Sequence, residues 1–427
     1  MDREISGLEK AYTVAVLLYF TGAFFRTFHE VRDPTAGAST GNFAANLIWA
    51  CIYLSSAWLV TTRCSLSRAF LHRLWPLFLL YSVVLLSVIW SDAPKVSFLR
   101  LGALVGSTLF GLYFGTRYPL KMQLVLLGWT FGMAAVLSVI FSLLFPDYSI
   151  GTGPFEGMWL GIYEHKNALG MNMAIGFTVF LVLSHCYPAR RWRFRALALA
   201  SVIVILFADS ATSLVECIVM SWVFLLVKTL QPWTKVTRLR AWFVAGSGLL
   251  LCASPFLFYE KIVAALGRDV ELTGRLVVWG LVWDNITQRP LLGYGYFAFW
   301  RGVDGPLGYL ISIADGSGNG LLDLLSELGL LGLVAFLIVY VVFVRRSFIA
   351  LREWRIPEAI WPLFFLAWLP VVDITEDAIL RPNQVPWVLF IAVATALSAH
   401  GRDFVADRAQ AIGYVPEAKF GHFQGQE

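Results

Sequence analysis

Apolar runs of about the length of a bilayer crossing recur along most of the chain. A helix needs about 20 mostly apolar residues to cross the hydrocarbon core of a membrane. The chain has 427 residues, of which 58% are hydrophobic and 14% are charged. A soluble domain of this length could not hide so much apolar surface in its core. The sequence therefore predicts an all-α polytopic membrane protein.

We expect about twelve transmembrane helices in a single domain formed by residues 1–400. The predicted spans are residues 11–28, 43–62, 74–90, 97–116, 122–145, 167–186, 194–208, 212–229, 241–259, 321–344, 359–373 and 384–399. Residues 1–10 carry mixed charge and no clear cleavage site follows them, so we expect the first span to be retained. Residues 401–427 are predicted to form a polar cytoplasmic tail.

Basic residues predict the orientation, because cytoplasmic loops carry an excess of arginine and lysine. Alternate connections hold Arg63, Arg68 and Arg73; Arg117 and Lys121; Arg190, Arg191, Arg193 and Arg195; Lys228, Lys235, Arg238 and Arg240; and Arg345, Arg346, Arg352 and Arg355. These connections share one face if both termini are cytoplasmic. Residues 146–166 and 260–320 then form periplasmic loops, the second between spans 9 and 10. The bias also explains the net charge of +5, so no nucleic-acid partner is expected.

The five cysteines predict neither a disulfide framework nor a metal site. Cys51, Cys64, Cys186, Cys217 and Cys252 lie inside spans or near their cytoplasmic ends. None lies in a predicted outer loop, and no Cys-x-x-Cys pattern occurs.

The large outer loop contains a stretch that is amphipathic rather than spanning. Thr273 is a plausible N-cap, and Arg275, Trp279 and Trp283 follow at intervals of one helical turn. Such a helix is expected to lie over the outer face of the bundle, with tryptophan at headgroup depth. A cation in the first turn opposes the helix dipole by about 0.3–1 kcal/mol, so Arg275 suggests a bound anion. The alternative is an arginine that reaches to lipid phosphate.

Arg100 is a second candidate for anion binding on the same side. Asp92 and Pro94 mark a helix start near the outer face, which places Arg100 roughly 10 Å inside at about 1.5 Å per residue. An arginine at that depth is costly and is a functional candidate by default. The alternative is a structural pair with Glu376 or Glu216. Arg100 and Arg275 together could bind a diphosphate at the membrane surface.

Other polar residues share this face but have simple structural alternatives. Glu164, His165, Lys166 and Asn167 stand where a loop enters a span, and could form an ordinary helix cap. The segment TEDAILRPNQVPW could be a solvated loop whose Glu376, Asp377 and Arg381 pair with one another. Glu216 is expected to form a hydrogen bond between helices, and Asp323 and Glu327 are expected to be structural.

Four stretches, in order, resemble the bacterial O-antigen ligase and Wzy-type polymerase superfamily, particularly its exopolysaccharide-polymerase branch. They are SVIWSDAPKVSFLR (87–100), GIYEHKNALG (161–170), LTGRLVVWGLVWDNITQRPLLGYGYFAFW (272–300) and SGNGLLDLLSELGLLG (317–332). The resemblance covers most of residues 85–335.

The resemblance implies a glycosyltransferase that needs no metal or other cofactor. Its donor would be an oligosaccharide on undecaprenyl diphosphate, at the periplasmic face of the bacterial inner membrane. Arg100 and Arg275 match the arginines that would bind the diphosphate. The remaining candidates are His165, Glu164 and Glu376 as catalytic residues, and Lys166, Asn167, Trp279, Asn319 and Trp300 as substrate-binding residues. Membrane lipids, a polysaccharide flippase and a chain-length regulator are the implied partners.

The chain departs from the family pattern at Gly318. Many members, ligases especially, have a histidine directly before the asparagine of the fourth motif, and it is regarded as the base. Glycine cannot accept a proton, so His165, Glu164 or Glu376 would have to act, or positioning alone would suffice. The departure favours a polymerase over a ligase. A transporter or flippase of lipid-linked sugars, or a non-catalytic scaffold, are alternatives from other classes, although no internal repeat typical of transporters is evident.

Overall fold

The computed structural model describes residues 5–24, 43–64, 66–230, 269–300, 306 and 316–399. Among these residues the regular elements are all helical, and the only β pairing is an isolated bridge between Ile150 and Trp159. The predicted all-α class is therefore confirmed.

The helices follow one another in a simple series. They are α1 (Gly7–Phe20), α3 (Phe43–Arg63), α4 (Arg68–Arg73), α5 (Trp75–Trp90), α6 (Pro94–Arg117), α7 (Leu120–Leu144), α8 (Pro146–Ser149), α9 (Lys166–Cys186), α10 (Arg191–Phe207), α11 (Ala211–Leu230), α13 (Asp269–Gln288), α14 (Gly320–Glu353), α15 (Ile360–Val372) and α16 (Val385–Ser398). Short 3-10 turns lie at Gly153–Phe155, Pro188–Arg190 and Pro357–Ala359.

Six of these helices are long and apolar enough to cross a membrane: α3, α6, α7, α9, α11 and α14. Each predicted span that falls on described residues coincides with a helix, whereas the span predicted at 241–259 lies outside them. The predicted first span, residues 11–28, begins and ends too late, because α1 begins at Gly7 and ends at Phe20. Small residues let the helices approach closely. A Cβ on Gly115 of α6 would lie 1.8 Å from the Thr395 Oγ1 atom of α16.

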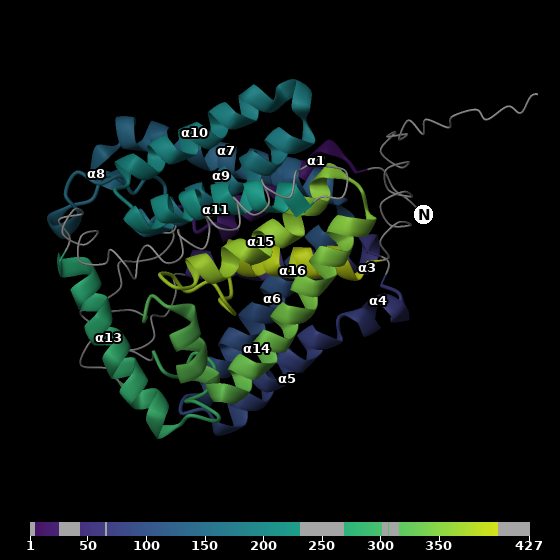
Figure 1. Cartoon of the computed structure of the whole chain (residues 1–427). Coiled ribbons are helices and arrows are strands. Elements are labelled where there is room, and N and C mark those ends of the chain that lie inside the picture. Colours follow the sequence, from purple (N-terminus) through teal and green to yellow (C-terminus); the bar gives the residue numbers. More distant parts are fainter. Residues whose placement is uncertain are drawn as a thin grey trace, which may run out of the picture.

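The predicted outer loops gather at one end of the bundle. Figure 1 shows α8 and α13 at the left edge, while α4 lies at the right. The loop between α15 and α16, residues 373–384, also turns at the left end. Segments that are far apart in the sequence therefore meet there.

The predicted start of the amphipathic helix is wrong. The helix α13 begins at Asp269, so Thr273 does not cap it and Arg275 lies in its second turn. The preceding stretch, DVELTG, supplies helix-compatible residues and acidic types that suit a helix start. The argument that Arg275 opposes the dipole in a first turn therefore fails.

The apolar face of α13 packs on protein. Val278, Val282 and Ile286 are buried in a small cluster with Tyr294 and Phe299, and the helix lies against α14. Trp283, which is predicted to anchor the helix at headgroup depth, is 53% exposed.

Residues 290–297, which we call the strap, fill a break in α14. Gly329 has a left-handed backbone (φ 62°) that interrupts α14. The freed carbonyls of Ser326 and Glu327 accept hydrogen bonds from the Tyr294 and Gly295 N–H groups at 2.9 and 2.8 Å. Residues 330 and 331 donate in turn to carbonyls of the strap. The break therefore leaves these backbone groups paired and fixes the strap to the bundle.

Candidate functional site

The α15–α16 loop is the element around which the polar residues gather. The Asp373 Oδ1 atom accepts hydrogen bonds from the Ala378 and Ile379 N–H groups at 3.0 and 3.2 Å. The Asp373 carbonyl accepts from the Gly320 N–H at 2.9 Å. Asn319, which caps α14, also donates its Nδ2 to the Ile374 carbonyl at 3.2 Å. These bonds fold the loop on itself and join it to the start of α14.

Arg275 reaches this loop from α13. Its Nη1 donates to the Thr375 carbonyl at 2.6 Å, and its Nη2 lies 3.7 Å from the Glu376 Oε1 atom. Its helix is placed by Trp279, whose Nε1 donates to the Ser317 carbonyl at 2.8 Å. Arg275 is thus directed at the polar loop.

Glu376 lies between two of the segments identified from the sequence. Besides Arg275, the Asn167 side chain at the start of α9 lies close enough to Glu376 to lower the pKa of its carboxyl. Burial raises the pKa of the Glu376 carboxyl to about 7, although the Arg275 guanidinium acts in the opposite direction. A carboxyl with this pKa can accept or donate a proton near neutral pH.

Gly318 lies beside Arg275. A Cβ at this position would approach the Arg275 Cζ and Nη1 atoms to 3.7 Å and the Thr375 carbonyl oxygen to 3.6 Å. A side chain at 318 would therefore point at the guanidinium. Glu376, the residue after Thr375, contacts the same guanidinium from the α15–α16 loop.

The three residues before Asn167 have different surroundings. His165 caps α9, with its Nδ1 accepting from the Asn167 N–H at 3.2 Å and its ring edge-on to Phe155. Lys166 is buried, and its Nζ lies 3.5 Å from the Asp209 carbonyl oxygen. Glu164 is exposed. The cap expected as the alternative is present, and Asn167 is the residue of this group that reaches Glu376.

Arg100 is the seventh residue of α6, and the predicted helix start at Pro94 is confirmed. Its side chain is exposed, and its Cζ lies 4.9 Å from the centroid of the Phe297 ring. The alternatives expected for it involved two acids. Glu376 pairs with Arg275, and Glu216 accepts from the Trp368 Nε1 at 3.0 Å. Glu216 thus forms the predicted bond between helices.

A buried cluster around Arg381 was not predicted. Its guanidinium forms ion pairs with Asp323, with Glu327 at 2.8 Å and with Asp377 at 2.9 Å. Asp377 and Arg381 pair within the loop as expected, but Glu376 contacts Arg275 of α13 instead, and Arg381 is buried rather than solvated. Trp300 joins the cluster by donating its Nε1 to Asp323 at 2.9 Å. The sequence does contain a signal for this cluster. Asp323 and Glu327 lie one turn apart on an apolar helix, and two buried carboxylates require a cation as a partner.

Arg275 contacts the α15–α16 loop directly, and Arg100 is connected to the same loop through the ring of Phe297. Arg275 contacts Thr375 and Glu376 in the α15–α16 loop. Arg100 contacts Phe297, whose ring centroid also lies 4.7 Å from the Arg381 Cζ in the same loop.

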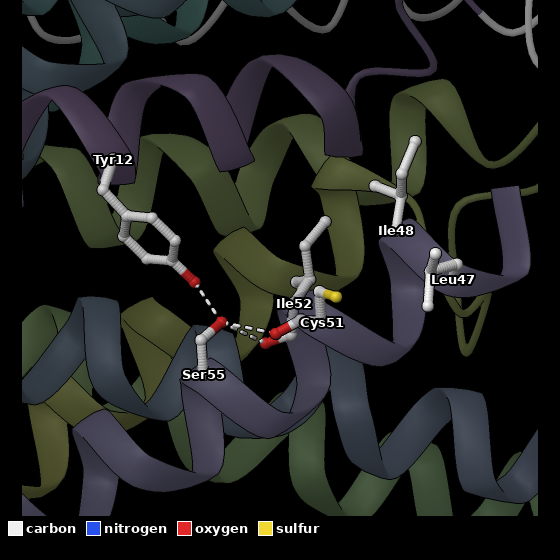
Figure 2. A pocket seen from close by; sticks show the side chains of 6 residues that line it. All are labelled: Tyr12, Leu47, Ile48, Cys51, Ile52 and Ser55. Carbon is white, nitrogen blue, oxygen red and sulfur yellow. Dashed lines mark hydrogen bonds between the residues drawn. The ribbon is translucent and has the colours of Figure 1, made fainter. Parts of the chain in front are cut away.

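A separate cavity of about 430 Å³ lies between α1 and α3. Figure 2 shows its lining, in which the Tyr12 hydroxyl and the Ser55 hydroxyl are hydrogen bonded at 2.6 Å. The other lining residues are Leu47, Ile48, Cys51 and Ile52. None of these described lining residues is charged, so they do not suit a diphosphate. We assign the candidate site to the charged residues around the α15–α16 loop.

The fold and this arrangement define a multi-pass, all-α membrane protein with arginines and carboxylates gathered at one end of its helices. Residues 196–337 match the family model described as O-antigen ligase. The chain is also 27% identical over 350 residues to the exopolysaccharide production protein ExoQ of Rhizobium meliloti (strain 1021), with 78% of each protein covered. These matches agree with the resemblance to the O-antigen ligase and polysaccharide polymerase superfamily.

Proposed function

We propose that the protein is a glycosyltransferase that polymerises repeat units carried on undecaprenyl diphosphate, without a metal, at the periplasmic face of the inner membrane. The observation that carries the proposal is the Arg275 guanidinium 3.7 Å from the Glu376 carboxyl, beside Gly318. An anion-binding group and a proton acceptor are thus adjacent at the end of the bundle where the predicted outer loops meet.

Arg275 and Arg100 are assigned to the diphosphate of the donor. A guanidinium has five N–H donors, so Arg275 can keep its bond to the Thr375 carbonyl and still bind phosphate oxygens. Negative charge grows on the diphosphate as its bond to the sugar breaks. Contacts with the two arginines therefore strengthen in the transition state, which is the condition for catalysis.

The reaction requires one proton transfer. The acceptor hydroxyl oxygen attacks the anomeric carbon, and the bond from that carbon to the diphosphate oxygen breaks with its electron pair. The hydroxyl proton passes to the Glu376 carboxylate. We favour Glu376 as the base because it lies beside Arg275, whereas the Nδ1 atom of His165 already accepts the cap bond of α9. Asn167, which lies close to Glu376, would orient the carboxylate or the acceptor sugar.

Transfer of a finished glycan to another acceptor is the second candidate, and the description of the matching family model favours it. The two activities share the donor and differ in the acceptor. The absence of a side chain at Gly318, where a histidine is typical of ligases, favours the polymerase. A flippase that delivers the repeat units and a regulator of chain length would be the partners.

The test measures the amount of lipid-linked repeat units in cells that carry Arg275→Ala or Arg100→Ala. We expect single repeat units on undecaprenyl diphosphate to accumulate and polymer to fall. Arg289→Ala is the matched control, because Arg289 also lies at this end of the bundle but forms a surface pair with Asp92, which contributes little. Unchanged polymer length and yield in both site variants, with protein present, would rule out the proposal.

A further inference from the structure

The ring of Phe297 contacts two guanidinium groups. The Cζ atoms of Arg100 and Arg381 lie 4.9 and 4.7 Å from its centroid, both within the range of a cation–π interaction. The two arginines differ in burial. Arg381 is buried and forms ion pairs with three carboxylates, and Arg100 is exposed on α6.

The backbone of Phe297 is held in an unusual conformation. Its φ of +57° lies in the left-handed region, which bulky side chains rarely adopt and which persists only where the surroundings impose it. The neighbouring residue Tyr296 is fixed by hydrogen bonds to two other segments. The Tyr296 carbonyl accepts from the Ser97 hydroxyl at 2.7 Å, and the Tyr296 hydroxyl donates to the Leu380 carbonyl at 2.6 Å. The backbone of Phe297 also lies close to the Glu327 carboxyl.

An aromatic ring and a carboxylate contact an arginine in different ways. The ring contacts the face of the guanidinium, does not use its N–H donors and does not neutralise its charge. A guanidinium has five N–H donors, so an arginine that contacts a ring with its face can also bind the oxygens of an anion.

We propose that Phe297 is a positioning residue, whose ring is fixed by Arg381 and the strap and holds the Arg100 guanidinium where it binds a phosphate of the lipid diphosphate. The inference rests on the proposed function, because it assumes that Arg100 binds the donor. Phe297 was not among the candidate residues predicted from the sequence. Its contact with Arg381 would also give the Arg381 cluster a role in substrate binding.

The experiment measures binding of undecaprenyl diphosphate to the purified full-length chain in detergent, together with thermal stability. Phe297→Leu removes the ring and keeps an apolar side chain, and should weaken binding about 3- to 30-fold. Phe297→Tyr restores a ring and should return the dissociation constant to within about twofold of the wild type. In the Arg100→Ala background, Phe297→Leu should cause no further loss, because the ring acts through Arg100.

Each other outcome overturns the inference in an identifiable way. If Arg100→Ala weakens binding but Phe297→Leu does not, the inference fails and the proposed function stands. If Phe297→Leu lowers thermal stability alone, or weakens binding equally without Arg100, the residue is merely structural. If neither Arg100→Ala nor Arg275→Ala changes binding, the proposed diphosphate site fails together with the inference.

Discussion

Glu376 shows how its neighbours can change what a carboxyl group does. An ordinary glutamate is almost fully ionised at neutral pH and is a weak base. Burial against α9 and α13 raises the pKa of Glu376 to about 7, despite the nearby Arg275. A base is most effective when its pKa lies near the working pH. In the proposed reaction Glu376 would therefore act as the proton acceptor, on the guanidinium that also lies beside Gly318.

We expect Glu376→Gln to lower kcat by about 100- to 10,000-fold, the usual contribution of a general base. In the wild type, kcat should fall as the pH drops through about 7, because protonation removes the acceptor. His165→Asn is the matched comparison, since asparagine can still cap α9 but cannot take up a proton. Initial rates of glycosyl transfer from pH 5 to 9 check both. A wild-type rate for Glu376→Gln, with the pH dependence lost in His165→Asn, would identify His165 as the base instead.

At the scale of elements, the site depends on the break in α14. An unbroken helix would occupy its own carbonyls at Ser326 and Glu327, and the strap would have nothing to bind. The bound strap sets Tyr296 and Phe297 beside α6 and the α15–α16 loop. Gly329 is therefore a structural residue on which the geometry of the site depends.

We expect Gly329→Ala to destabilise the protein by on the order of 2–4 kcal/mol, because overpacking adds to the strain of a left-handed backbone. Its Cβ would lie 2.4 Å from the Leu291 carbonyl carbon, a backbone atom that cannot move aside cheaply. Gly280→Ala is the control, since no atom lies within 4 Å of a Cβ there, and it should stabilise α13 by about 0.5–1 kcal/mol. Thermal unfolding in detergent compares the two. Equal stability of both variants would contradict this account of the strap.

The sequence predicts the helices better than the contacts between them. Hydropathy located the spans on described residues, because each helix must present an apolar surface to lipid. The sequence placed Arg275 and the TEDAILRPNQVPW segment on the same face through the predicted orientation, but it did not predict their contact. The Arg381 cluster, the break at Gly329 and the role of Phe297 depend on pairings between distant segments, which no local pattern encodes. The start of α13 was missed because Thr-Gly resembles a cap signal although the preceding residues can continue the helix.

At the scale of the whole molecule, the gathering of the polar residues favours chemistry at one membrane face. Arg275, Glu376 and Asn167 come from α13, the α15–α16 loop and α9, which meet at one end of the helices. A basic connection, α4, lies at the other end (Figure 1). This arrangement agrees with the orientation inferred from the distribution of arginine and lysine.

We expect single cysteines at the two ends to be accessible from opposite sides of the membrane. Asp147→Cys in α8 and Arg68→Cys in α4, each in a background without the five native cysteines, provide exposed positions. In spheroplasts, a membrane-impermeant maleimide should label position 147 directly, and position 68 only after permeabilisation. Labelling of both from the same side would contradict the predicted topology.

The central claim is glycosyl transfer from a lipid diphosphate donor by the charged residues around the α15–α16 loop. The most direct measurement is the release of undecaprenyl diphosphate by the purified full-length chain, reconstituted with its lipid-linked repeat unit and no added metal. We predict one undecaprenyl diphosphate for each new glycosidic bond, and a rate at least about 100-fold lower in Arg275→Ala, the order of loss expected for removal of a transition-state charge contact. Wild-type release by Arg275→Ala, or polymer formed without release of undecaprenyl diphosphate, would contradict the account.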